Sequence, residues 1–281
     1  MTKVLFSTLI LLTTLVGISF AQTSEDTPSP KKKRTKGTLY GSWGYNREWY
    51  TKSDIRIHND GDPSQQNANG SYDFTIHNAT ARDRDDFDQI PDVANITIPQ
   101  FSFRLGYLFN DKHDLGIEIN YDHAKYIVND NQNLRVTGQI FGTPIDKDTV
   151  VDATTFLHFE HSDGANFLCF NLVKRFQIYN SKSENCRFSA IVKAGPGLVY
   201  PRTDVTLFGT RVNNKWHVAG YIVALEVGPR IELYKYFFAE WTAKVGYANY
   251  TNALVAENTA RANHKFGTFM TILTIGFQVP L

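Results

Sequence analysis

From Gly37 onward the sequence alternates apolar and polar residues with a period of two, the spacing of a β-strand whose two faces meet different environments. The final segment shows this most clearly, with Leu273, Ile275, Phe277 and Val279 each two residues from the next. Turn-forming residues separate the segments. The pattern predicts eight strands, near residues 37–50, 100–109, 113–128, 164–179, 187–200, 216–233, 237–250 and 267–281.

The connections between these segments alternate in length. Those after the second, fourth and sixth segments are short, at 110–112, 180–186 and 234–236. Those after the first, third, fifth and seventh are long, at 51–99, 129–163, 201–215 and 251–266. Short turns at one end and long loops at the other are typical of a transmembrane β-barrel. We therefore predict an all-β fold, an eight-stranded antiparallel up-and-down transmembrane β-barrel with short periplasmic turns and long extracellular loops.

The mean hydropathy of −0.31 is compatible with this prediction. A strand crosses a membrane with only ~9–11 residues, and about half of them face lipid.

The N-terminal residues complete the predicted organisation. Lys3 precedes an apolar run, and Ser19 and Ala21 place small residues at the −3 and −1 positions of a cleavage site.

Three regions follow from these features. Residues 1–21 are predicted to be a signal peptide. Residues 22–36 contain the run Lys-Lys-Lys-Arg at 31–34 and are predicted to be a disordered basic tail in the periplasm. Residues 37–281 form the barrel. The predicted location is the bacterial outer membrane, with an integral protein whose N- and C-termini are periplasmic.

Two hairpins predict specific contacts across the barrel interior. Centring one turn on Asp111 and another on Lys235 sets opposite charges against each other on one face and apolar residues on the other, as an antiparallel ladder favours. The predicted interior ion pairs are Arg104 with Glu118, Arg230 with Glu240, and Glu226 with Lys244.

The inward-facing ionisable residues of all eight segments balance in sign. The basic ones are Arg104, Arg175, Lys193, Arg230 and Lys244, and the acidic ones are Glu48, Glu118, Asp122, Glu226 and Glu240. Side chains can fill the interior of an eight-stranded barrel, and buried charges are tolerated when they are paired. The balance predicts a plugged interior. A proton or ion pathway is the alternative interpretation of the same residues.

These features resemble the eight-stranded outer-membrane barrels of Gram-negative bacteria, the class of the OmpA membrane domain. The C-terminal run from Gly276 to Leu281 is similar to the signal that the barrel-assembly machinery reads, although it ends in Leu where Phe is usual and has Pro280 before it. The resemblance implies the barrel-assembly machinery, outer-membrane lipid and lipopolysaccharide as partners.

The stretch from His158 to Asn166 is the strongest candidate for chemistry. In an extended chain His158, Glu160 and Ser162 share one face, as a base, an orienting acid and a nucleophile would. The stretch resembles the His-x-Ser-Asn motif of outer-membrane lipid A deacylases, which implies catalytic roles for Ser162 with His158 or His161. It departs from that motif because His161 and Ser162 are adjacent and Asp163 replaces Asn. The competing interpretation is an ordinary loop-to-strand turn at the solvent-exposed rim of the barrel.

Further polar residues are predicted at the loop-side rim, where they would bind lipopolysaccharide phosphates or sugars, or only solvate the rim. They are His123, Lys125, Arg202, Asp204 and His217.

Other classes of function lack support in the sequence. The 29 Lys and Arg residues nearly balance 28 Asp and Glu residues, which gives no electrostatic case for nucleic-acid binding. The acidic run at 83–88 lacks the spacing of an EF-hand loop, and we predict neither a metal site nor a cofactor. Cys169 and Cys186 are not expected to meet across their hairpin.

Two of the long loops show additional strand-like pieces. Residues 55–59 and 74–78 are similar to each other, and a second pair lies around 132–141 and 149–158. We predict hairpins that project from the membrane, the alternative being a barrel of ten or twelve strands. The favoured function is a plugged outer-membrane barrel acting in envelope structure or in extracellular binding through its loops. A lipid A-modifying hydrolase is the alternative, and a small pore is the third.

Overall fold

The computed structural model describes residues 37–83, 100–110, 113–161, 163–256 and 259–281. The predicted signal peptide, the basic tail, Ser162 and most of the acidic run lie outside the described residues. Within the described part of the chain, no helix is long and apolar enough to cross a membrane.

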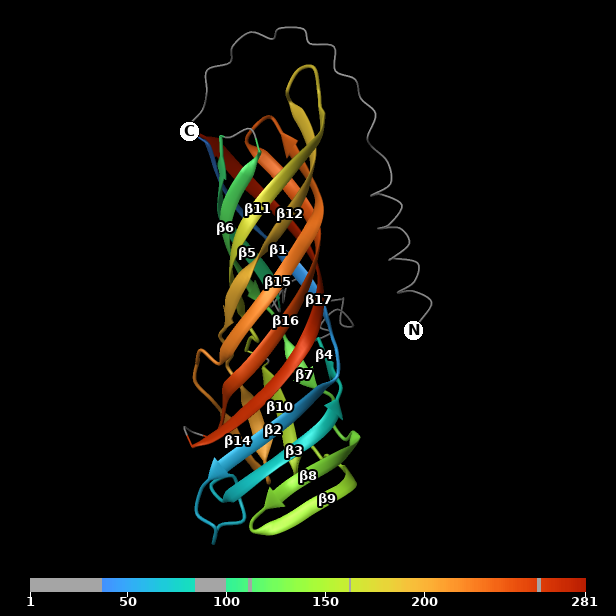
Figure 1. Ribbon diagram of the computed structural model, residues 1–281, viewed down its shortest axis with the longest axis vertical. Helices are drawn as coiled ribbons and strands as arrows, with labels where there is room; N and C mark the ends of the chain where they lie inside the picture. Colours follow the sequence, from blue (N-terminus) through green and yellow to red (C-terminus); the bar gives the residue numbers. More distant parts are fainter. Residues whose placement is uncertain (1–36, 84–99, 111–112, 162, 257–258) are drawn as a thin grey trace, which may run out of the picture. The chain divides into compact units, whose positions relative to one another are not determined.

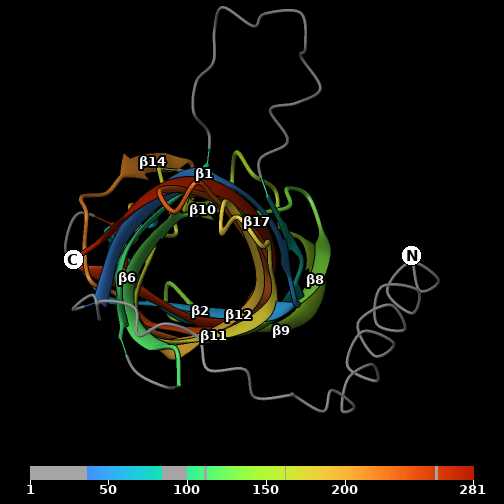
Figure 2. The same cartoon turned by 90° about the horizontal axis from the view of Figure 1, so that it is seen from above.

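Eight antiparallel strands close into a barrel, which Figure 2 shows as a ring. Their order is β1-β5-β6-β11-β12-β15-β16-β17, and β17 pairs back onto β1 from Thr38↔Pro280 to Tyr50↔Thr268. The closed ring of eight strands confirms the predicted fold class and strand number. The barrel strands are β1 (Gly37–Tyr50), β5 (Phe101–Phe109), β6 (Leu115–His123), β11 (Phe167–Asn180), β12 (Cys186–Val199), β15 (Gly220–Leu233), β16 (Phe237–Ala256) and β17 (Ala260–Pro280).

The barrel wall has apolar side chains outside and polar side chains inside. Leu172, Trp241 and Ile275 are exposed by 71%, 65% and 69% on the outer face, whereas Arg104 and Lys193 are buried on the inner face. A monomer in water rarely exposes a continuous apolar belt of this kind. The arrangement is that of a transmembrane barrel, whose outer face meets lipid.

The long connections form a second structure, which we call the cap, at the barrel end opposite the C-terminus (Figure 1). Beyond the barrel β17 pairs with β2, and this sheet continues through β3, β8 and β9. A second sheet has the order β14-β13-β10-β7-β4. The cap strands are β2 (Ser53–Asp60), β3 (Ser71–Ala79), β4 (Ala81–Arg82), β7 (Tyr126–Val128), β8 (Asn133–Ile140), β9 (Thr143–Val150), β10 (Leu157–His161), β13 (Asp204–Leu207) and β14 (Thr210–Asn213).

The cap has an apolar core of its own. Ile57, Phe74 and Val136 from the first sheet and Phe159 and Val205 from the second are all buried in one cluster. The inside-to-outside pattern therefore reverses along the chain. Apolar side chains face outward where the strands form the barrel wall, and inward where the strands form the cap.

The predicted loop hairpins are partly right. The pieces at 55–59 and 74–78 do form one hairpin, with Ile57 opposite Phe74, and they add no strand to the barrel ring. The second hairpin is wrong in one arm, because β8 pairs with 143–150 and residues 157–161 belong to the other sheet. The predicted loop at 201–215 contains the β13–β14 hairpin.

The predicted register is right for one barrel hairpin and wrong for the other. Arg230 lies opposite Glu240 and Glu226 opposite Lys244, as predicted. Arg104 lies opposite Asn120 and not Glu118, a shift of two residues that leaves every side chain on its predicted face. Just before β6, Asp114 takes a left-handed conformation, with φ of 50°, and its carboxylate lies 2.8 Å from Arg175.

Candidate functional site

The barrel interior holds a connected network of charges. Lys193 Nζ lies 2.9 Å from Glu118 Oε2 and 2.7 Å from Glu240 Oε2. Arg104 lies 3.1 Å from both Asp122 and Glu226. These side chains are fully buried, and a buried charge without a partner would cost several kcal/mol. The pairing therefore explains how polar groups fill the barrel.

The network extends toward the turn end of the barrel. Arg230 donates to Glu240 Oε1 at 2.6 Å, to Glu232 Oε1 at 2.9 Å and to Gln278 Oε1 at 2.6 Å. Its guanidinium carbon also lies 3.6 Å from the ring centroid of Phe238. Each donor nitrogen of this buried guanidinium thus has an acceptor, and one of its flat faces is covered by a ring.

The predicted ion pair of Arg104 with Glu118 is present, at 3.9 Å, but one other predicted pair is replaced and one acid was not predicted. Lys244 and Glu226 are opposite in register, but the Lys244 amine lies 2.6 Å from Asp122 Oδ2. The predicted acid set also omits Glu232, which is 3% exposed and contacts Arg175, Arg187 and Arg230. Glu232 follows Arg230 by two residues, so strand alternation places it on the same inward face.

The structure keeps His158 and Glu160 together and places His161 on the other face of β10. On β10, His158 Nδ1 lies 2.7 Å from Asp130 Oδ1 and its Nε2 lies 3.5 Å from Glu160 Oε2. The carboxylates of Glu160 and Asp130 raise the pKa of His158 to about 9, even though partial burial opposes the charge. At neutral pH this imidazole is therefore a cation held between two acids, and not a free base.

His161 lies on the opposite face of β10, fully buried. Its Nε2 is 3.1 Å from His264 Nε2 on β17, and its Nδ1 is 3.0 Å from Thr203 Oγ1. Burial lowers the pKa of His161 well below its ordinary value and that of His264 to about 3, so both imidazoles are neutral. His264 was not among the predicted site residues. The available signal was its position two residues before Phe266, which places both side chains on the inward face of β17.

The predicted rim residues divide into two groups. Lys125 and Asp204 are at least nine-tenths buried in the cap, where Asp204 binds Arg211 at 2.6 Å. The other three have polar partners at the barrel margin. These contacts are His123 Nδ1 to Asn166 Oδ1 at 2.7 Å, Arg202 Nη1 to Asp163 Oδ2 at 3.0 Å and His217 Nε2 to Asn252 Nδ2 at 3.0 Å.

Two turns of the same sequence meet in the cap. Phe141-Gly142 joins β8 to β9, Phe208-Gly209 joins β13 to β14, and Thr follows each glycine. Both phenylalanines have φ of 49°, a left-handed conformation that costs a residue with a Cβ ~1–2 kcal/mol. Their ring centroids lie 4.7 Å apart, which ties one cap sheet to the other.

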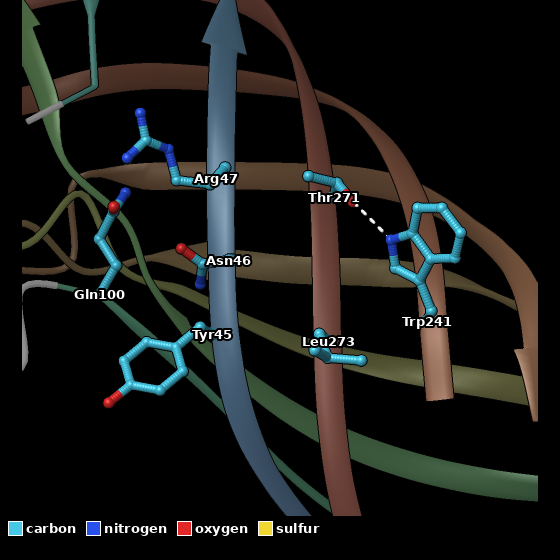
Figure 3. A pocket seen from close by; sticks show the side chains of 7 residues that line it. All are labelled: Tyr45, Asn46, Arg47, Gln100, Trp241, Thr271 and Leu273. Carbon is cyan, nitrogen blue, oxygen red and sulfur yellow. Dashed lines mark hydrogen bonds between the residues drawn. The ribbon is translucent and has the colours of Figure 1, made fainter. Parts of the chain in front are cut away.

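A hollow of about 260 Å³ lies in the barrel wall across β1, β17 and β16 (Figure 3). Tyr45, Leu273 and Trp241 line it, and Trp241 Nε1 donates to Thr271 Oγ1 at 3.0 Å. The bond satisfies the one polar group of an indole that faces outward. Among the described residues, no group of three or more His, Cys, Asp or Glu side chains could hold a metal ion.

No family model matches the sequence, and no curated protein matches it. Several solved outer-membrane proteins are similar to the chain. OprG from Pseudomonas aeruginosa is 12% identical over 88% of this chain and 98% of that chain, with a TM-score of 0.42. Ail, the attachment invasion locus protein of Yersinia pestis, in complex with the heparin analogue sucrose octasulfate, is 12% identical over 87% and 99%, with a TM-score of 0.32. Neisserial surface protein A is 9% identical over 88% and 98%, with a TM-score of 0.32.

Proposed function

We propose that the chain is an integral protein of the bacterial outer membrane that presents a rigid β-sheet cap outside the cell as a binding surface. One observation carries the proposal. The long connections pack around an apolar core, while paired charges fill the barrel below them. A filled barrel supports a closed membrane anchor, and a cap with its own core supports a fixed surface rather than a set of mobile loops.

Aromatic side chains at both ends of the apolar belt support its insertion in a lipid bilayer. At the cap end, the rings of Tyr200 and Trp216 stack with centroids 5.6 Å apart, and both are partly exposed. At the turn end, Tyr236 stacks on Phe277 at 6.0 Å. Tyrosine and tryptophan favour the boundary between lipid tails and headgroups.

Lipopolysaccharide is the proposed lipid partner at the cap end. Burial lowers the pKa of His217, and the nearby cations Arg261 and Lys215 lower it further. In the described part of the chain, neither Lys215 nor Arg261 forms an ion pair. This positive margin beside Trp216 supports an interaction with anionic headgroups. The exposed Phe277, Val279 and Leu281 at the turn end support recognition by the barrel-assembly machinery.

Cysteine labelling in intact cells tests the proposal. In a background with Cys169→Ser and Cys186→Ser, a membrane-impermeant maleimide should label Lys147→Cys in the cap and spare Lys182→Cys in the β11–β12 turn. Both native lysines are exposed, so accessibility within the fold is matched. Labelling of Lys182→Cys alone would show that the turn end faces outside the cell, and the cap could then not serve as an extracellular surface.

The hydrolase alternative has a separate test. His158 and Glu160 lie 3.5 Å apart on β10, which is the feature that favours it. Mass spectrometry of lipid A from cells with the native chain and with Ser162→Ala should show the same acylation if the cap only binds. A difference in lipid A acyl chains between the native and the Ser162→Ala cells would establish the hydrolase.

A further inference from the structure

Strand β9 is the last strand of the sheet that runs from the barrel into the cap. It pairs with β8 on one side, and no described strand pairs with its other side. Most of its eight residues are exposed, and it lies outside the ring of barrel strands in Figure 2. A free edge of this kind offers unpaired backbone donors and acceptors to another chain.

Alternate residues of β9 direct their backbone groups to the free edge. Phe141-Gly142 makes a two-residue turn, so Ile140 and Thr143 form the first backbone-bonded pair of the hairpin. At the other end, Val151 N donates to Gln132 O at 2.9 Å. Odd-numbered residues therefore bond to β8, and even-numbered ones face outward. The outward set is Pro144, Asp146, Asp148 and Val150.

The outward set carries an excess of negative charge. Asp146 and Asp148 share one face of the strand, and both lie near a single cation, with Arg135 nitrogens at 2.6 and 3.8 Å. All three side chains are exposed. Lys147 lies on the opposite face, across from Val136. Beside the free edge, two acids thus face one base.

We propose that β9 binds an extended basic segment of a partner polypeptide as an added strand, with Lys or Arg at alternate positions beside Asp146 and Asp148. The inference rests on the proposed function, because it assigns a partner class to the cap. Main-chain hydrogen bonds would supply affinity in such a complex, and the alternating side chains would supply specificity.

The same two acids disfavour a second copy of this chain at the edge. An antiparallel copy that keeps both sheets facing the same way would set even-numbered residues against even-numbered residues. Asp146 would then meet Asp146 or Asp148, and like charges directly opposite each other are destabilising. Pro144 also lacks an N–H to donate at its end of the strand. The edge therefore selects a basic strand over itself.

Peptide binding to the full-length protein in detergent micelles tests the inference. The probe is a synthetic heptapeptide of sequence Thr-Lys-Val-Lys-Val-Lys-Thr with blocked ends, measured by calorimetry. Asp148→Pro removes an outward N–H and keeps the bonds to β8, so binding should be lost. Asp146→Asn with Asp148→Asn should weaken binding about tenfold through two exposed charge contacts. Asp60→Asn, an exposed acid on β2, should leave the dissociation constant unchanged.

Three results would overturn the inference. Equal binding by the Asp148→Pro variant would show that the edge is not used. Equal binding of a heptapeptide with Glu in place of Lys would remove the charge argument. A concentration-dependent dimer that Asp148→Pro abolishes would make a second copy the occupant. The labelling of Lys147→Cys in cells is independent of all three, so its failure would identify a failure of the proposed function instead.

Discussion

The Nε2 atoms of His161 and His264 lie 3.1 Å apart inside the cap and join β10 to β17. Rings surround the pair, with His264 centroid distances of 5.2 Å to Tyr126 and 4.6 Å to Tyr250. Within the described chain no carboxylate forms an ion pair with either imidazole, and His264 Nδ1 has no hydrogen-bond partner. A proton on this pair would place a charge in a nearly apolar enclosure.

The stability of the cap should therefore fall in acid. The pKa of both histidines is lowered in the fold, to about 3 for His264, whereas the unfolded chain titrates near 6.5. Between these values the unfolded state binds more protons, so the free energy of unfolding decreases as the pH drops below about 6.5. Thermal unfolding from pH 7.5 to 4.5 should show this slope, and His264→Gln should flatten it. The same slope in the variant would contradict the assignment.

His158 should show the opposite pH dependence. Its pKa of about 9 is raised by Glu160 and Asp130, so its contribution to stability is complete below pH 6.5 and is lost as the pH rises through 9. The imidazole is partly exposed, and solvent screening limits the contribution to about 0.5 kcal/mol. His158→Gln should lower the melting temperature slightly at pH 7 and leave it unchanged at pH 10. An equal loss at both pH values would indicate packing alone.

Lys193 should be indispensable to the barrel interior. Lys193→Met leaves Glu118 and Glu240 without the shared ammonium, and breaking a buried pair costs about 3–5 kcal/mol. Urea unfolding of the protein in lipid vesicles should show this loss. Lys182→Met, at an exposed turn position, is the matched control and should change the free energy of unfolding by less than about 0.5 kcal/mol. Equal midpoints for the two variants would contradict the network.

The Phe141–Phe208 contact should stabilise the cap despite its backbone cost. Phe208→Ala removes ring contacts to Phe141 at 4.7 Å and to Tyr72 at 5.3 Å, and should destabilise the cap by about 2 kcal/mol. Phe208→Asn also loses the ring, but asparagine tolerates the left-handed conformation, so it should be milder by about 1 kcal/mol. Protease cleavage rates of the cap would rank the two variants. A milder alanine variant would contradict the role of the backbone.

The barrel could be predicted from the sequence because each wall residue meets one of two contrasting environments. Period-two alternation then reports the inward face directly, and it locates Arg230, Glu240 and Lys244 correctly. The register of the first hairpin could not be predicted in the same way. A shift of two residues keeps every side chain on its face, so the alternation is the same in both registers.

The cap was harder to predict because its strands are short and several of its pairings join strands that are distant in the sequence. β17 pairs with β2, and β10 lies between β7 and β13. The candidate site shared this difficulty. His161 could be singled out from its local sequence, but its partner His264 is 103 residues away. Nothing in the local pattern distinguishes His264 from any other inward residue of β17.

Planar-bilayer conductance of the purified protein tests most directly whether paired charges close the barrel. Four charged side chains inside the barrel are fully buried and paired: Lys193 binds Glu118, and Arg104 binds Asp122. We predict no sustained openings at neutral pH, because each ionic group in this cross-section is held by a fixed counterion. Sustained large openings of the wild-type protein would contradict the closed interior.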